Sequence, residues 1–303
     1  MCSLAVCEPL TPAAPTRVQG KFTVDGKDYS LAINNGPNSL HGGIQSFSWQ
    51  FWTAAVIDVE GAPPAVRFEY TSPDMEEGFP GECVATVVYT VSDLGELTVA
   101  MEARVSKTCP VSFANHSYFN LGGHSSGDIL GTKLHLNCDR YTPTDDTQIP
   151  TGEVRPVKGT PFDFTAPLAE AHTIGERIDD VAAADGFDAC QGYDHNLAVN
   201  TGGIRGNPAA LSLVAEAIDP TSGRTMALYS NAPGVQLYTG NFIDGLPGKD
   251  GATYEKHAGF CLETQHFPNS VNTPNFPSVL LSPGEVYSHT MHYRFGGRPS
   301  AKL

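Results

Sequence analysis

Short runs of alternating apolar and polar residues, separated by turn-forming residues, restrict the fold of this chain more than any other feature. This alternation has the two-residue period of a β-strand with one buried face. The 31 Gly and 23 Pro agree with frequent turns, and only Leu168–Ala184 carries a helical pattern, which Thr173-Ile174-Gly175 weakens. The predicted strands are Lys21–Val24, Tyr29–Ile33, Val66–Tyr70, Val84–Val91, Leu97–Val105, Lys133–Leu136, Leu211–Ile218, Met226–Ser230, Val235–Tyr238 and Tyr287–Phe295. The sequence therefore predicts an all-β fold, a large antiparallel β-sandwich.

The first two predicted strands flank Asp25-Gly26, a strong hairpin signal because both turn positions tolerate positive φ.

Neither an internal repeat nor a linker-like segment divides the chain, and β-sandwiches of this length commonly form one domain. We expect a single domain over residues 1–303, with a flexible C-terminal tail over 296–303.

The charge balance argues against anionic partners. The chain has 18 basic and 33 acidic residues, a formal charge of −15. No basic field is available to attract nucleic acid or an anionic membrane surface. A phosphorylated substrate would usually need an Arg or Lys clamp, so a neutral substrate is the better match. No apolar run is long enough to span a bilayer.

The cysteines and the two ends of the chain bear on compartment. Seven scattered cysteines form no Cys-x-x-Cys pair, which predicts free thiols in a reducing compartment and no metal site. The N-terminus lacks the basic and apolar regions of a secretory signal, so we predict a cytoplasmic protein. The alternative is a peroxisome, because the terminal Ala301-Lys302-Leu303 is a conservative variant of the Ser-Lys-Leu address.

Two segments carry the strongest candidates for chemistry. Phe260–Pro268 places Glu263 in an apolar, β-like run with few other charges. Burial raises the pKa of a carboxyl group and suits it to act as a general base near neutrality. Far upstream, Asn115–Leu121 places His116 in a polar and aromatic setting. From the residues alone, a buried ion-pair partner is the favoured interpretation of Glu263, ahead of a catalytic role.

These segments and several others together resemble the aldose 1-epimerases (galactose mutarotases). The resemblance covers nearly the whole chain and implies a β-sandwich that interconverts sugar anomers without a cofactor or metal. The motifs that carry it, besides the two above, are Pro37–Gly43, Ser72–Glu82, Ile149–Glu153, Gly192–Asn196 and Gly234–Asn241.

The resemblance also implies roles for individual residues. Glu263 would be the catalytic base and His116 the acid, while His41, Asp194 and Gln236 would bind the sugar. Taken alone, His41 also suits a capping or core role, and Asp194 beside Asn and Gly suits an Asx-turn. For the aromatic residues near the motifs, packing in the core is favoured over stacking on a sugar face. These aromatic residues are Phe79, Tyr118, Phe242 and Phe267.

The N-terminal part departs from the family pattern. Relatives carry several strands before the hairpin, ending in an arginine that contacts the substrate, whereas here residues 1–16 match poorly. A sandwich that is incomplete at its N-terminus is therefore expected. The place of the family arginine falls on Thr16, and Arg17 could substitute only if the strand slips by one residue.

Three functions follow from these patterns. The first is an aldose 1-epimerase acting on free hexoses such as galactose and glucose, as a monomer or weak dimer. The second is a non-catalytic sugar-binding or regulatory relative that lost activity with its N-terminal strands. The third, a sugar-phosphate epimerase, lacks an identifiable cationic phosphate site.

Overall fold

A computed structural model describes residues 11–12, 20–185, 191–201 and 210–297. Two antiparallel β-sheets contain most of its strand residues. The larger sheet has eight strands in the order β10-β14-β15-β21-β7-β6-β5-β4. Their bounds are β4 (Thr53–Ile57), β5 (Ala65–Ser72), β6 (Cys83–Ser92), β7 (Glu96–Val105), β10 (Lys133–Leu136), β14 (Ser212–Ile218), β15 (Thr225–Ser230) and β21 (Tyr287–Gly296). The predicted all-β fold, an antiparallel sandwich, is confirmed.

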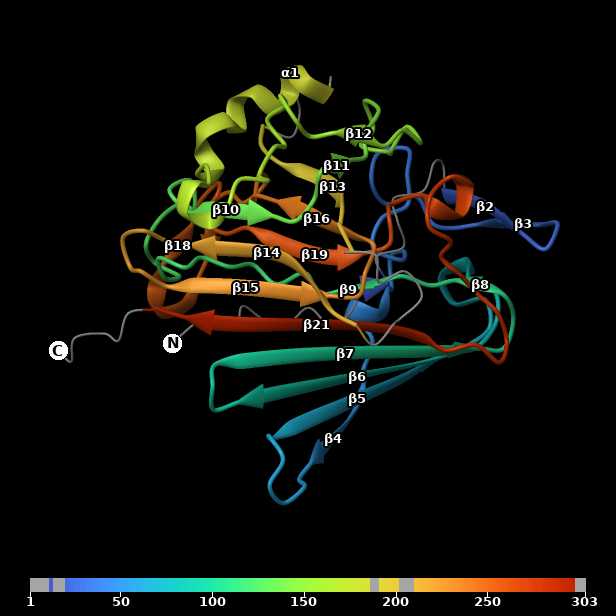
Figure 1. The fold of residues 1–303 in the computed structure, drawn as a ribbon. Helices are drawn as coiled ribbons and strands as arrows, with labels where there is room; N and C mark the ends of the chain where they lie inside the picture. Colours follow the sequence, from blue (N-terminus) through green and yellow to red (C-terminus); the bar gives the residue numbers. More distant parts are fainter. Residues whose placement is uncertain (1–10, 13–19, 186–190, 202–209, 298–303) are drawn as a thin grey trace.

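A five-stranded sheet in the order β12-β11-β13-β16-β19 lies against the β10-β14-β15 side of the larger sheet (Figure 1). Its strands are β11 (Arg140–Tyr141), β12 (Arg155–Pro156), β13 (Asp194–Ala198), β16 (Gly234–Tyr238) and β19 (Cys261–Gln265). Four two-stranded pairs complete the β-structure: β1 (Thr11–Pro12) with β9 (Phe113–Ala114), β2 (Lys21–Val24) with β3 (Lys27–Ser30), β8 (Cys109–Pro110) with β20 (Leu280–Leu281), and β17 (Leu246–Pro247) with β18 (Thr253–Tyr254).

The predicted hairpin turn forms where expected. Val24 pairs with Lys27, and the two residues between them have φ values of 51° at Asp25 and 73° at Gly26. The second strand, however, covers Lys27–Ser30 and not the predicted Tyr29–Ile33. The turn sets this register. Pairing begins with Val24 and Lys27 beside the turn and ends with Lys21 and Ser30, because Lys21 is the first residue of β2.

The predicted helix over Leu168–Ala184 is wrong as a continuous element. The segment forms two 3₁₀-helices, η4 (Leu168–Glu170) and η5 (Ile174–Asp180), followed by the one-turn α1 (Val181–Asp185). Backbone pairing beside β10 interrupts it: Ile174 donates its N–H to the Thr132 carbonyl at 2.9 Å, and Leu134 donates to His172 at 3.2 Å. Tertiary pairing thus overrides the local helical pattern. Short 3₁₀-helices elsewhere are η2 (Phe47–Trp49), η3 (Glu76–Gly78), η6 (Lys249–Gly251) and η7 (Ser270–Asn272).

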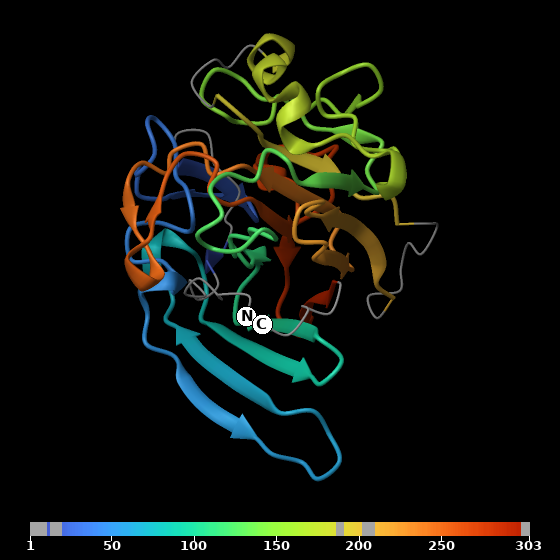
Figure 2. The same cartoon turned by 90° about the vertical axis from the view of Figure 1, so that its left-hand side faces the viewer.

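The apolar core includes the alternate residues that face inward from both sheets. In β19, Leu262 is 1 % exposed and packs in this core. The other strands contribute residues such as Val87, Met101, Leu134, Leu197, Val235, Leu237 and Met291. The opposite edge of the large sheet, at β4 to β6, projects away from the rest of the described structure (Figures 1 and 2), and Val56 of β4 is 78 % exposed there.

The structure bears on the predictions about thiols and membrane spans but not on those about Arg17 and the C-terminal tripeptide. The described cysteines that are free thiols are Cys83, Cys109, Cys138 and Cys261. Arg17 and the terminal Ala301-Lys302-Leu303 lie outside the described residues. Among the helices in the described part of the chain, none has the length and apolar character that crossing a bilayer requires.

Candidate active site

A pocket of about 320 Å³ opens over one face of the five-stranded sheet. Because successive side chains alternate between the two faces of a strand, neighbouring strands present rows of paired residues. Asp194 of β13 pairs with Tyr238 of β16, which pairs with Cys261 of β19. The next row on the same face is Asn196, Gln236 and Glu263. The pocket lining comprises Asn35, Leu40, His41, His116, Tyr118, Thr144, Gln148, Pro150, Asp194, Asn196, Gln236, Tyr238, Phe242, Glu263, Gln265 and Pro268.

Glu263 and His116 meet at one side of this pocket. Glu263 Oε1 lies 3.6 Å from His116 Nε2, and both side chains are nearly buried, with exposed fractions of 9 % and 12 %. The segment that carries His116 is tied to the start of β19 by two backbone hydrogen bonds between Phe119 and Phe260, of 2.8 and 3.0 Å. A histidine and a carboxylate in contact within a pocket can act as an acid and base pair.

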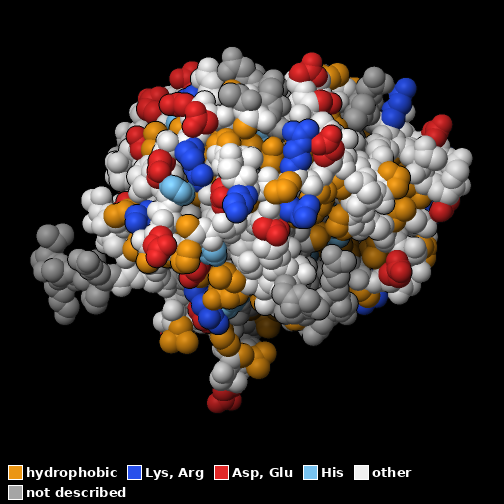
Figure 3. Space-filling model, turned by 45° about the horizontal axis from the view of Figure 1, so that its top comes forward, with side chains coloured by type: hydrophobic (Ala, Val, Ile, Leu, Met, Phe, Trp, Pro, Cys, Tyr) orange, Lys and Arg blue, Asp and Glu red, His pale blue; other side chains and the backbone are white. Residues whose placement is uncertain are grey.

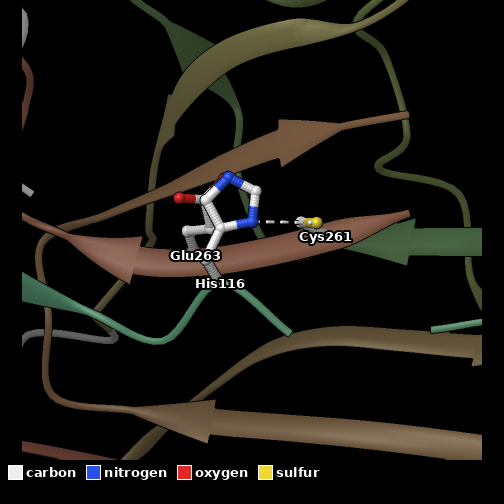
Figure 4. A group of neighbouring side chains, drawn as sticks. All are labelled: His116, Cys261 and Glu263. Carbon is white, nitrogen blue, oxygen red and sulfur yellow. Dashed lines mark hydrogen bonds and ion pairs between the residues drawn. The ribbon is translucent and has the colours of Figure 1, made fainter. Parts of the chain in front are cut away.

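Cys261 contacts the other nitrogen of the His116 ring. Its Sγ lies 3.3 Å from Nδ1, so the imidazole sits between a thiol and a carboxylate (Figure 4). These three side chains place a nitrogen, a sulfur and an oxygen within 4.8 Å of one another, a set of donors that can bind a zinc ion. The two ring nitrogens, however, face different partners, so the observed contacts suit a hydrogen-bonded chain better than one shared ion.

His41 reaches the pocket from a loop and not from a strand. Its ring centre lies 5.6 Å from that of His116, in an edge-to-face arrangement. Burial, and secondarily the nearby His116, lower the pKa of His41 from 6.5 to about 4. His41 is therefore neutral near pH 7, with one ring nitrogen available as a donor and the other as an acceptor.

Asp194 is held by two amide side chains. Its Oδ1 accepts a hydrogen bond from Gln236 Nε2 at 2.7 Å, and its Oδ2 accepts one from Gln148 Nε2 at 3.1 Å. The Asx-turn interpretation of Asp194 is wrong, because the residue begins β13 and its side chain faces the pocket. A carboxylate has about four acceptor positions, so these two bonds leave capacity for further donors.

Two buried oxygens near Asp194, Asn196 Oδ1 and Gln236 Oε1, have no hydrogen-bond partner among the residues that the structure describes. Gly234 leaves the space that the Asn196 amide occupies, since a Cβ atom at position 234 would lie 2.5 Å from Asn196 Oδ1. Buried polar atoms are normally satisfied, so these two acceptors are a local cost of the packing beside the pocket.

The structure brings most of the predicted site residues together. Glu263, His116, His41, Asp194 and Gln236 all line the pocket, while Arg17 lies outside the described residues. Sequence reasoning missed Gln148, Asn196, Tyr118, Tyr238, Cys261 and Gln265 as residues at the site. The two-residue period starting from Glu263 was the available signal for Cys261 and Gln265.

The expectation that nearby aromatic residues pack in the core holds only in part. Phe267 is buried, at 5 % exposed, and Phe79 packs against the core. Phe242 is 63 % exposed and lines the pocket, so the core interpretation is wrong for it. Tyr118 also lines the pocket, with its ring stacked on His116 at a centre distance of 5.1 Å.

Comparison with known proteins gives a consistent assignment. The family model for aldose 1-epimerase matches residues 6–294. Human galactose mutarotase is 46 % identical over 278 residues, which cover 91 % of this chain and 75 % of the relative. Aldose 1-epimerase of Escherichia coli K12 is 34 % identical over 277 residues, with the same coverage of both chains. The crystal structure of a GalM/aldose epimerase homologue from C. elegans superposes with a TM-score of 0.78 at 26 % identity, covering 95 % of this chain and 82 % of that one.

The family model and these relatives assign the antiparallel sandwich, with its contacting histidine and carboxylate, to the isomerase class of enzymes. The chain belongs to the aldose 1-epimerase family. The resemblance drawn from the motifs and the assignment to the isomerase class are thereby confirmed.

Proposed function

We propose that this protein interconverts the α and β anomers of free hexoses such as galactose and glucose by acid and base catalysed ring opening. The observation that carries the proposal is the contact between Glu263 and His116 within one pocket, at 3.6 Å. The names of the relatives, galactose mutarotase and aldose 1-epimerase, support the same reaction.

In the proposed reaction, Glu263 removes the proton from the C1 hydroxyl while His116 protonates the ring oxygen. The bond between C1 and the ring oxygen breaks, and the C1–O bond becomes the carbonyl of the open aldehyde. Rotation about the C1–C2 bond exposes the opposite face of this carbonyl. On closure His116 takes the proton back from the attacking hydroxyl and Glu263 returns its proton to the C1 oxygen, so both groups regain their starting states.

The remaining pocket residues would orient the sugar. Neutral His41 can hydrogen-bond the sugar near C1, and Asp194, with Gln236 beside it, can bind ring hydroxyls. The described residues lining the pocket include no Lys or Arg, which favours a neutral sugar over a sugar phosphate. On the face shown in Figure 3, basic side chains lie among acidic and hydrophobic ones.

Polarimetry of freshly dissolved α-D-galactose tests the proposal directly. The purified protein should bring the optical rotation to its equilibrium value much faster than buffer does, and α-D-glucose should behave similarly. A folded protein that leaves the rate at the buffer value would favour the alternative, a sugar-binding relative without turnover.

For compartment we propose the cytoplasm, with the peroxisome as the alternative. Fusing the last dozen or so residues, which end in Ala301-Lys302-Leu303, to a fluorescent reporter separates the two. A diffuse signal supports the cytoplasm. Puncta that disappear when Leu303 is deleted would support import through the C-terminal address.

A further inference from the structure

The loop that carries His41 has an unfavourable backbone conformation. His41, Gly42 and Gly43 have φ values of 53°, 79° and 112°, three consecutive positive angles. This region is uncommon for residues with a side chain and persists only where the surroundings impose it. Residues 40–45, which we call the His41 loop, must therefore be held by contacts from outside it.

Glu77 supplies one set of these contacts. Its Oε2 accepts a hydrogen bond from the backbone N–H of Ile44, and its Oε1 accepts one from Gln45, both at 2.9 Å. Gly43 makes this approach possible, because a Cβ atom there would lie 2.1 Å from Glu77 Oε2. Hydrogen bonds to an ionised carboxylate are roughly twice as strong as those between neutral groups.

Asn34 holds the loop from its other end. Its Nδ2 donates to the carbonyl oxygens of Leu40 at 2.9 Å and Gly43 at 3.0 Å, and its Oδ1 accepts from the Leu40 N–H at 2.7 Å. Leu40 immediately precedes His41, so the backbone on both sides of the histidine is fixed by side-chain hydrogen bonds. Neither Asn34 nor Glu77 is among the residues that line the pocket.

We infer that Glu77, assisted by Asn34, is a positioning residue for the reaction, acting through His41 without touching the substrate. This inference rests on the proposed function, since it assumes that His41 binds the sugar. Without the two Glu77 hydrogen bonds, the Ile44 and Gln45 N–H groups would turn to water and the loop would sample other conformations. The His41 ring would then spend less time facing the sugar.

A double-mutant cycle tests this coupling. Glu77→Ala should lower kcat/KM by about tenfold in the wild-type background, within the range of coupling between residues in one hydrogen-bonded network. In a His41→Ala background the same change should alter kcat/KM less than about twofold, because the group it positions is gone. Equal losses in both backgrounds would overturn the inference, as would no loss in either.

Two further variants make the result specific. Glu82→Ala is the matched control, because Glu82 is an exposed glutamate of the same segment whose backbone N–H donates to Ser106 Oγ at 2.8 Å, so the change in side chain and charge is the same. It should leave kcat/KM near the wild-type value. If Glu77→Ala does not fold, Glu77→Gln, which keeps only one acceptor oxygen, takes its place with a smaller loss.

A spectroscopic readout separates this inference from the proposed function. The imidazole NMR signals of His41 should shift or broaden in Glu77→Ala and stay unchanged in Glu82→Ala. Unchanged signals in both variants would overturn the positioning role. An inactive wild-type protein, or a His41→Ala variant with normal kcat/KM, would instead contradict the proposed function while the NMR comparison still decides the role of Glu77.

Discussion

The two walls of the pocket are built by different kinds of backbone. One wall is the face of β13, β16 and β19, where ladder hydrogen bonds and the two-residue period set the place of each side chain. The other wall, at His41, is a loop with three consecutive positive φ angles, and the side chains of Asn34 and Glu77 hold it. The strand wall is specified by register, whereas the loop wall depends on individual side-chain contacts.

Because of this difference, substitutions in the two walls should act in different ways: those in the strand wall on the chemical groups, and those around the loop wall on the position of His41. The strand wall carries Glu263 and the network around Asp194, and the ladder would survive a change to either side chain. Substitutions there should therefore remove a chemical group and leave the geometry intact. On the loop wall, a change at a distant residue should act by moving His41. The predictions below use this contrast, beginning with the largest expected effect.

Glu263→Gln should lower kcat by about 10²–10⁴ while preserving the fold, because it removes the proposed general base. His116→Ala should cost a similar factor. Since both groups act in one step, the double variant should be about as slow as the slower single variant. Stopped-flow polarimetry and circular dichroism check these outcomes.

The exposed Glu255, in the segment before β19, offers a control with the same change in charge. Glu255→Gln should retain wild-type kcat. If Glu263→Gln were as active as this control, the role given to Glu263 would be wrong.

Asp194→Asn should raise KM by about tenfold or more and lower kcat less, because hydrogen bonds to a charged acceptor are worth roughly 1.5–3 kcal/mol. Gln236 and Gln148 still surround the substituted side chain, so the fold should persist. Initial rates over a range of galactose concentrations give the two constants. An unchanged KM would show that Asp194 does not contact the sugar.

The sequence predicted the local features better than those that depend on tertiary contacts. The Asp25-Gly26 turn was correct because two adjacent residues determine it. The helix over Leu168–Ala184 was wrong because pairing with the β10 region, which lies far away in sequence, interrupts it. Thr173-Ile174-Gly175 marked the weak point of the helical pattern, but a local pattern does not show which distant segment pairs there.

The same distinction holds within the site. Glu263 and His116 were identified through motifs, and the alternation along β19 would also have given Cys261. The contacts of Glu77 with Ile44 and of Gln148 with Asp194 join residues 33 and 46 positions apart. They arise only when the loops meet in the folded chain, so no spacing rule could reveal them.

Acidification should destabilise the protein through His289, which is buried, and through His41 and His266, which are half-buried. Burial lowers the pKa of His41 and His266 to about 4 and that of His289 to about 3, against 6.5 in the unfolded chain. Below pH 6.5 the unfolded state therefore binds more protons than the folded state, and stability falls as the pH decreases toward 3. Urea unfolding at pH 7.5 and 5 should show this loss.

His289→Gln removes one of these titrating groups from behind the strand wall, where His289 Nε2 lies 2.8 Å from Thr264 Oγ1. The free energy of unfolding of this variant should depend less on pH than that of the wild type. An identical pH dependence in the two proteins would show that His289 does not contribute.

The smallest effect is expected at Cys261, the strand residue whose Sγ lies 3.3 Å from His116 Nδ1. A thiol can donate to this nitrogen or accept from it, so the contact can persist as His116 changes protonation state. Cys261→Ser keeps a group that can do both and should retain kcat within about twofold, whereas Cys261→Ala should lose roughly three- to tenfold, the equivalent of one modest hydrogen bond. KM should change little in either variant, because Cys261 is not among the residues that line the pocket. Equal kcat values for the Ser and Ala variants would show that the thiol only fills space beneath the imidazole. The orientation of His116 would then depend on the strand wall and the Phe119–Phe260 pairing alone.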